Sequence, residues 1–82
     1  MQFEHISENL SRDPDYLDRF MDEHKAAEFM GYTIRALQNW RLRGGGPKFI
    51  KVSGRSIRYR RRDLIQWGES LLVSSTSESA FA

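Results

Sequence analysis

Three side chains on one short segment carry the hydrogen-bonding groups that read nucleic-acid bases. In "TIRALQNWRLR", Arg35, Gln38 and Asn39 share the side of a helix opposite Leu37 and Trp40. Arginine can pair bidentately with guanine, and asparagine or glutamine with adenine, each good pair giving about 1–3 kcal/mol of discrimination. The alternative is a polar face that is merely solvated. With the residue that precedes the helix, the candidate base contacts are Thr33, Arg35, Gln38 and Asn39.

A second group of arginines stands on a segment that is typical of a β-hairpin. Arg55 occupies the turn between "KFIKV" and "SIRY", and Arg58 lies on the polar side of the second run. Basic residues on a hairpin either engage nucleic acid or protect an exposed strand edge from aggregation. Further cations could contact phosphates, which position a protein on nucleic acid without reading its sequence. These predicted phosphate contacts are Lys25, Arg41, Arg43, Lys48, Lys51, Arg60 and Arg61.

The formal net charge of +2 conceals a strong segregation of charge along the chain. Residues 24–62 hold eleven lysines and arginines but one acid, Glu28, whereas residues 1–23 hold seven acids and two arginines. A concentrated basic block is the electrostatic signature of a nucleic-acid-binding domain. A solvated charged surface is the simpler alternative.

Several other classes of protein are disfavoured by composition. The chain has no cysteine and only two histidines, so we expect neither a disulfide nor a zinc site, and no cofactor. "RGGGP" lacks the lysine-serine ending of a phosphate-binding loop, and we expect no enzymatic activity. The N-terminal sequence lacks the pattern of a secretory signal, and no apolar run is long enough for a bilayer. A cytoplasmic protein is therefore expected.

The candidate base contacts require a pair of short helices to hold them. The segment "DEHKAAEFMG" predicts one helix, capped by Asp22. A second helix is expected to begin after Thr33 as N-cap and to end at Gly44. Because only Gly31-Tyr32 separates the two helices, they form a helix-turn-helix. The phase of Trp40 with Leu37 predicts a core position for the indole rather than a base-stacking one.

The hairpin and a final helix should complete the core. Ile57 and Tyr59 share one face of the second run, and we expect Ile50 and Val52 to point inward on the first, with Phe49 at an edge. In "RRRDLIQWGESLLV", apolar residues recur with helical spacing, so a closing helix is expected.

The ends of the chain are expected to contribute less. Asp13-Pro14 predicts the start of a short helix with Tyr16, Leu17 and Phe20 as its apolar stripe. The predicted organisation is a flexible acidic arm over 1–12, one domain over 13–72, and a disordered tail over 73–82.

Residues 21–70 resemble the MerR-like, excisionase or AlpA type of winged helix-turn-helix domain found in phage and integrated-element proteins. The matching positions are Ala26-Ala27, Gly31, Thr33, Arg35, Leu37, Trp40-Arg41, Gly46-Pro47, Ile57, Tyr59 and Asp63-Leu64. The resemblance implies a mainly α-helical fold with a small β-hairpin as the wing. It also implies sequence-specific binding of double-stranded DNA, with the second helix in the major groove and the wing, through Arg55 and Arg58, in the adjacent minor groove.

Many such proteins are excisionases, or recombination directionality factors, which bend attachment-site DNA so that a site-specific integrase favours excision. The resemblance therefore implies a partner integrase and a DNA-associated protein in a bacterial host cell. One domain of this size buries about 600–1,000 Å² on DNA, so several copies are expected to bind cooperatively. The acidic residues 1–23 could contact the basic face of the next copy, shield the molecule's own surface, or keep it soluble.

Two other functions remain open from the sequence. A small transcriptional regulator would read DNA with the same parts, although the chain ends soon after Trp67 without the long dimerisation helix that MerR-type regulators append. A protein-interaction adaptor resembling an antitoxin would instead use the acidic arm or the tail. RNA binding is less expected, because no exposed aromatic pair for base stacking is evident.

Overall fold

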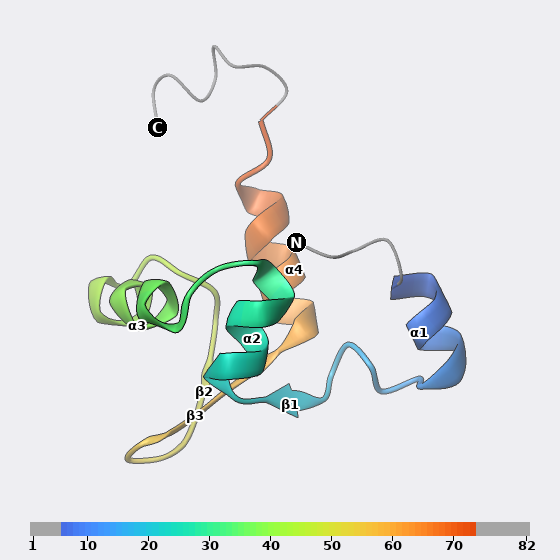
Figure 1. Cartoon of the computed structure of the whole chain (residues 1–82), viewed down its shortest axis with the longest axis horizontal. Coiled ribbons are helices and arrows are strands. Elements are labelled where there is room, and N and C mark those ends of the chain that lie inside the picture. The colour runs from blue at the N-terminus through green and yellow to red at the C-terminus, as the bar shows by residue number, and fades with distance from the viewer. Residues whose placement is uncertain (1–5, 74–82) are drawn as a thin grey trace.

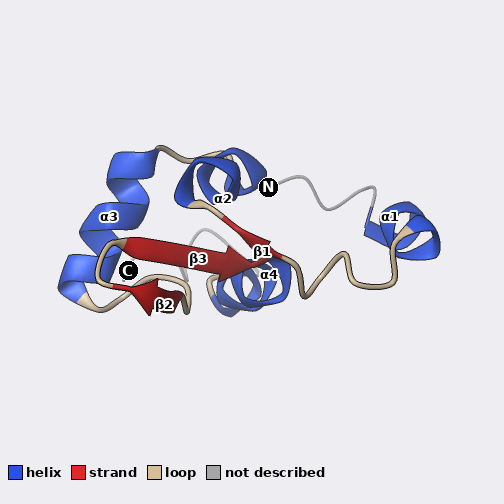
Figure 2. Cartoon of the chain, turned by 90° about the horizontal axis from the view of Figure 1, so that it is seen from below, coloured by secondary structure: helices blue, strands red, loops and turns tan. Residues whose placement is uncertain are grey.

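A computed structural model describes residues 6–73 of the chain. The described elements are α1 (Ile6–Arg12), β1 (Phe20–Met21), α2 (Glu23–Met30), α3 (Ile34–Arg43), β2 (Ile50–Ser53), β3 (Ser56–Arg60) and α4 (Arg61–Ser70) (Figure 1). Within this part of the chain, four helices accompany a three-stranded antiparallel sheet of order β1-β3-β2 (Figure 2). This mixed architecture is compatible with a winged-helix-like fold. None of these helices combines the length and apolar character needed to cross a membrane.

The helix pair α2–α3 begins and ends at the predicted residues. The Asp22 carboxylate accepts a hydrogen bond from the backbone N–H of Lys25 at 2.9 Å, and Thr33 Oγ1 accepts one from Ala36 at 3.1 Å. Each bond satisfies a backbone donor in the first turn of a helix, which otherwise has no partner. At the other ends, Gly31 and Gly44 adopt φ angles of 75° and 80°, which glycine reaches without strain. The predicted caps are confirmed.

The core lies where α2, α3, β3 and α4 meet. Ala26 and Ala27 are buried, and their small side chains let neighbouring elements approach α2 closely. The aromatic ring of Tyr59 on β3 is fully buried beside them. Among the described residues, the buried hydrophobic core cluster comprises Met21, Ala26, Ala27, Met30, Leu37, Tyr59 and Leu64.

Trp40 joins α3 to α4, as the predicted core role requires. Its ring lies 5.2 Å from Tyr32 in an edge-to-face arrangement and 4.7 Å from Trp67, measured between ring centroids. The Trp67 Nε1–H donates to the carbonyl oxygen of Gly45 at 3.2 Å, which anchors the glycine segment to α4. Gly46 lies against Trp40 so closely that a β-carbon on Gly46 would overlap Cβ of the tryptophan.

In the first strand of the hairpin, the side chains expected to face the core do not face it. Ile50 pairs with Arg58, and Lys51 pairs with Ile57. Because successive side chains alternate between faces, Lys51 shares the face of Ile57, whereas Ile50 shares that of Arg58. An irregularity follows between Lys51 and Ser53, and the Val52 side chain is 60% exposed. The expected inward positions of Ile50 and Val52 are therefore wrong.

The segment before α2 also differs from its prediction. No helix begins at Asp13; residues 14–18 form turns, and Phe20–Met21 form β1, in which Met21 pairs with Tyr59. The Asp13 carboxylate accepts hydrogen bonds from the Asp15 N–H at 3.1 Å and Arg19 Nε at 2.7 Å, local bonds that compete with a helix.

The region expected to be a flexible arm contains α1, which has no buried residue and stands apart from the core (Figure 1). Residues 1–5 of that arm lie outside the described residues. The same is true of the predicted tail beyond Val73.

We predict that acid loosens the attachment of the N-terminal segment. Hydrogen bonds from Arg19 and Arg62 lower the pKa of Asp13 and of Asp18, respectively, below the usual 3.8. A carboxylate whose pKa is lower in the folded state than in the unfolded state stabilises the fold at pH values above its unfolded pKa. This stabilisation is lost as the pH falls through the folded pKa. The free energy of unfolding should therefore decline as the pH falls below about 4. Urea unfolding across this range measures the decline, and Asp18→Asn should flatten it; an unchanged profile would contradict the assignment.

We predict that Gly46→Ala destabilises the fold by about 1–3 kcal/mol, because the added methyl group must displace Trp40. Gly45→Ala is the matched control, since a β-carbon there would meet no atom within 4 Å. Thermal unfolding followed by circular dichroism compares the two variants. Equal melting temperatures would show that the contact between Gly46 and Trp40 is not restrictive.

Candidate nucleic-acid interface

The outward face of α3 presents most of the predicted base contacts. Arg35, Gln38 and Asn39 are all exposed. Within residues 6–73, the side chains of Arg35 and Asn39 have no hydrogen bond or ion pair with the rest of the protein, so their donors and acceptors remain available. The Gln38 Nε2–H donates weakly to the Glu23 carboxylate, at 3.3 Å from Oε2. Thr33 is exposed, and its hydroxyl oxygen serves as the helix cap.

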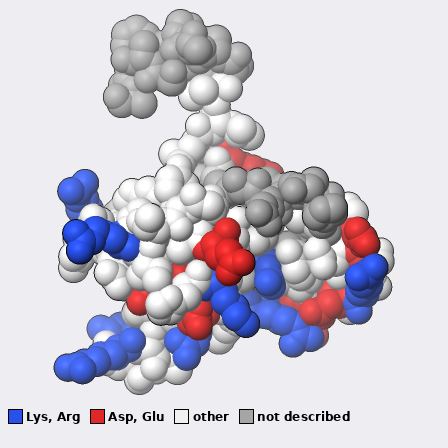
Figure 3. Space-filling model, in the orientation of Figure 1, with Lys and Arg blue, Asp and Glu red and all other residues white. Residues whose placement is uncertain are grey.

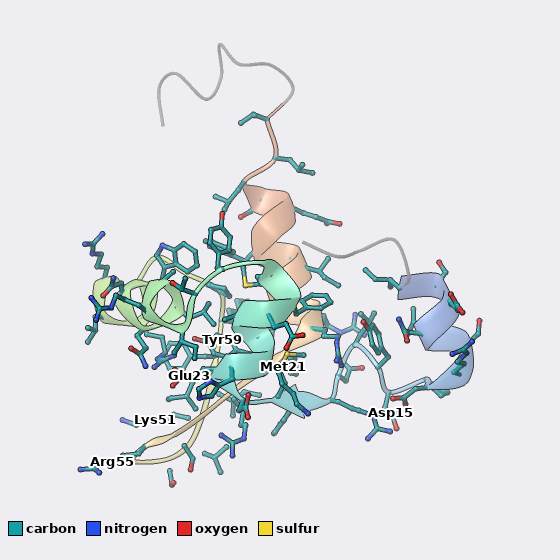
Figure 4. The ribbon with its side chains drawn as sticks, viewed as in Figure 1. Asp15, Met21, Glu23, Lys51, Arg55 and Tyr59 are labelled. Carbon is teal, nitrogen blue, oxygen red and sulfur yellow. The ribbon has the colours of Figure 1, made fainter. Side chains whose placement is uncertain are left out.

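The hairpin tip carries its cations beyond the body of the protein. Arg55 stands at the far end of the β2–β3 hairpin, with Lys51 a short way back along it (Figure 4). Both side chains are exposed, and neither forms an ion pair with a described residue. Gly54, in the same turn, has open space around it. The turn can therefore approach a partner closely.

A groove separates α3 from the hairpin and is formed by both. Its lining consists of Gln38, Arg41, Leu42, Phe49, Lys51, Gly54 and Ile57. Lysines and arginines gather over α3 and over the hairpin tip on the same side of the molecule (Figure 3). The two predicted nucleic-acid-binding elements thus border one surface.

Arg41 has a different position from the one predicted for it. The sequence places it among the outward-facing side chains, but only 18% of its side chain is exposed. Its Nη1 donates to the hydroxyl of Tyr59 at 2.9 Å and its Nη2 to Glu23 at 3.1 Å. Burial disfavours the guanidinium charge, yet these two partners outweigh it and raise the pKa of Arg41. Arg41 joins α2, α3 and β3 internally.

Two further predicted phosphate contacts are held within the protein. Arg60 binds the buried Asp63 through two hydrogen bonds of 2.8 and 3.1 Å. The Arg61 guanidinium lies 4.1 Å from the centroid of the Tyr16 ring and donates to that residue's carbonyl oxygen. These contacts orient both guanidinium groups toward other parts of the fold.

Arg58 does not line the groove with the hairpin tip. It lies on the strand face opposite Ile57 and Lys51, and its Nη1 donates to the Ile57 carbonyl oxygen at 2.8 Å. Four predicted phosphate contacts remain exposed and without an ion pair to any described residue: Lys25, Arg43, Lys48 and Lys51. Lys25 lies on α2 beside Glu28 and Phe29, away from the groove.

Leu42 is an unpredicted member of this surface. Its side chain is 87% exposed on the outward face of α3. The signal was available in the sequence, because position 42 is out of phase with the buried Leu37 and with Trp40. Across residues 6–73, no cluster of three or more acidic, histidine or cysteine side chains could hold a metal ion.

Comparison with protein-family models gave no match to this chain, and no curated protein matches it in sequence.

We predict that Arg41→Ala lowers the free energy of unfolding by about 1–3 kcal/mol, because the Tyr59 hydroxyl loses its hydrogen bond and Glu23 keeps only the weak bond from Gln38. Lys51→Ala is the control, because this exposed lysine has no such bonds. Urea denaturation measures both. If the two variants unfold alike, Arg41 is not the internal link described above.

Proposed function

We propose that this protein binds double-stranded DNA through α3 and the β2–β3 hairpin together. The observation that carries the proposal is that α3 and the hairpin line one groove together, with exposed lysines and arginines of both elements on the same side of the molecule (Figure 3). The combination of a helix and a basic hairpin on one side suits a duplex, which offers two adjacent grooves.

In this proposal α3 enters the major groove, whose width of about 12 Å admits an α-helix. Arg35 and Asn39 contact base edges, since their side chains are exposed and bond to no other residue in the described part of the chain. Gln38 also faces the duplex, although it shares its amide group with Glu23. Arg55 reaches the adjacent minor groove, where a narrow groove concentrates negative potential. Arg58 is left out of this role because of its internal bond.

The DNA phosphate backbone between the major and minor grooves would lie along the protein surface between α3 and the hairpin. Lys51 lines it, and Arg43 and Lys48 lie on the flanking segments. If about five of the seven predicted phosphate contacts formed, log affinity would fall with log salt at a slope of roughly −4 to −5. Arg41, Arg60 and Arg61 are held internally, and Lys25 lies away from the groove. The ionic contacts that remain are Arg43, Lys48, Lys51 and Arg55, so a slope of about −3.6 is expected.

We further propose that the DNA-binding unit is a winged helix-turn-helix that acts as a recombination directionality factor. This finer role is supported by the resemblance of residues 21–70 to excisionase-type domains and by the helix-turn-helix geometry of α2 and α3. An interface of this size is small, so several copies on neighbouring sites, together with an integrase, would shape the attachment DNA.

We predict that Arg55→Ala weakens binding to a selected duplex several-fold and makes the salt slope less negative by about 1, because one ionic contact is lost. Arg12→Ala is the matched control: Arg12 is also an exposed arginine, but it pairs with Glu8 on α1, far from the groove. Fluorescence anisotropy at several salt concentrations measures both variants.

If the two variants have equal affinities and equal slopes of log affinity against log salt, the hairpin is not part of the interface. Loss of binding in both would indicate a diffuse charge effect rather than a defined surface.

The recombination role is tested by following integrase-driven excision and integration with and without the protein. We expect excision to rise and integration to fall in its presence. If neither reaction changes while transcription from a promoter beside the bound site does, the protein is a regulator instead.

A further inference from the structure

Leu42 contributes a large, strongly exposed apolar side chain to the groove between α3 and the hairpin, which Phe49 and Ile57 also line. Its exposed fraction of 87% is the highest among the large exposed hydrophobic residues of the described chain. It does not belong to the core cluster or to the apolar residues packed against it. A single exposed leucine needs no explanation in general, but this one lines the groove between the two proposed DNA-binding elements.

The neighbours of Leu42 define its chemical setting. On α3, Gln38 and Asn39 lie one turn before it, and Arg35 lies two turns before it on the same side. Across the groove, Lys51 and Gly54 of the hairpin face it. An apolar group framed in this way by cations and amides is suited to a partner that is negatively charged overall but has a local apolar feature.

Duplex DNA has one such feature in the major groove, the C5-methyl group of thymine. We propose that Leu42 is a specificity-determining residue that contacts a pyrimidine C5-methyl group in the bound site. This inference rests on the proposed binding of α3 in the major groove. The same methyl group occurs in 5-methylcytosine, so the chemistry recognised is the methyl group rather than thymine as a whole.

Helix geometry also restricts where the methyl group lies. Leu42 is three residues from Asn39, an axial rise of about 4.5 Å, and seven from Arg35, about 10.5 Å. Base pairs are spaced about 3.4 Å apart along the duplex. The methylated pyrimidine should therefore lie about one base step from the base that Asn39 contacts and at most about three from the base that Arg35 contacts.

The test begins with selection of binding sites for the full-length protein from a random duplex library. Each thymine in the selected site is then replaced singly by deoxyuridine, which removes only the methyl group. We expect one replacement to weaken wild-type binding about fourfold, the effect of burying one methyl-sized group. Leu42→Ala should bind the unmodified site about as weakly as the wild type binds the deoxyuridine site. Deoxyuridine at that position should not weaken the binding of Leu42→Ala further.

Asn39→Ala provides the matched control on the same helix face, because it should bind less tightly but keep its sensitivity to deoxyuridine. A second arm places cytosine or 5-methylcytosine at the sensitive position. Wild-type protein should prefer the methylated base by a similar factor, and Leu42→Ala should not. Circular dichroism should give the same melting temperature for Leu42→Ala and the wild type, since the side chain is exposed.

The inference is overturned if a site is selected but no deoxyuridine replacement weakens wild-type binding, or if Leu42→Ala retains the sensitivity. An equal loss of affinity for every duplex in Leu42→Ala would assign Leu42 a non-specific contact and also overturn it. If the library yields no enriched duplex and binding to DNA is absent, the proposed function itself fails, and this inference fails with it.

Discussion

The guanidinium group of Arg41 fixes the position of the candidate recognition helix relative to the hairpin. It bonds at once to Glu23 at the start of α2 and to the hydroxyl of the fully buried Tyr59 on β3. The Phe49 ring, which leads into β2, lies near both Arg41 and Tyr59. Because these contacts join three elements at the floor of the groove, α3 and the hairpin cannot shift independently without leaving buried polar groups unpaired. The proposed joint engagement of two DNA grooves depends on this constraint.

The basic block of the sequence separates into two populations in the folded protein. Arg41, Arg60, Arg61 and Arg62 are engaged with acids, aromatic rings or carbonyl oxygens of the protein. The exposed cations of α3 and the hairpin, including Arg35, Arg43, Lys51 and Arg55, lack such partners among the described residues. A count of charges along the chain therefore overstates the surface available to DNA. The charge that remains is smaller but gathered on one side, as Figure 3 shows for α3 and the hairpin tip.

Local features of the fold could be predicted from the sequence, whereas features set by pairing between distant segments could not. The caps at Asp22 and Thr33 and the end of α3 at Gly44 depend on residues within one turn of the helix, so the sequence pattern was sufficient. Strand β1 exists because Met21 pairs with Tyr59, almost forty residues away, and two residues leave no periodic signal. The predicted inward phase of β2 is wrong because the pairing register places Ile50 opposite Arg58 and Lys51 opposite Ile57, and an irregularity follows Lys51. The internal roles of Arg41 and Arg61 depend on partners in other elements, Tyr59 and Tyr16, which a linear reading does not bring together.

We propose that α3 and the hairpin tip form a single DNA-binding surface. The most direct measurement is a titration of isotope-labelled protein with duplex DNA, following backbone amide chemical shifts by NMR. We expect the amide signals of Arg35, Asn39, Gly54 and Arg55 to shift together with one affinity, while those of α1 stay unchanged. Shifts confined to either element alone, or centred on α1 or on the far end of α4, would contradict it.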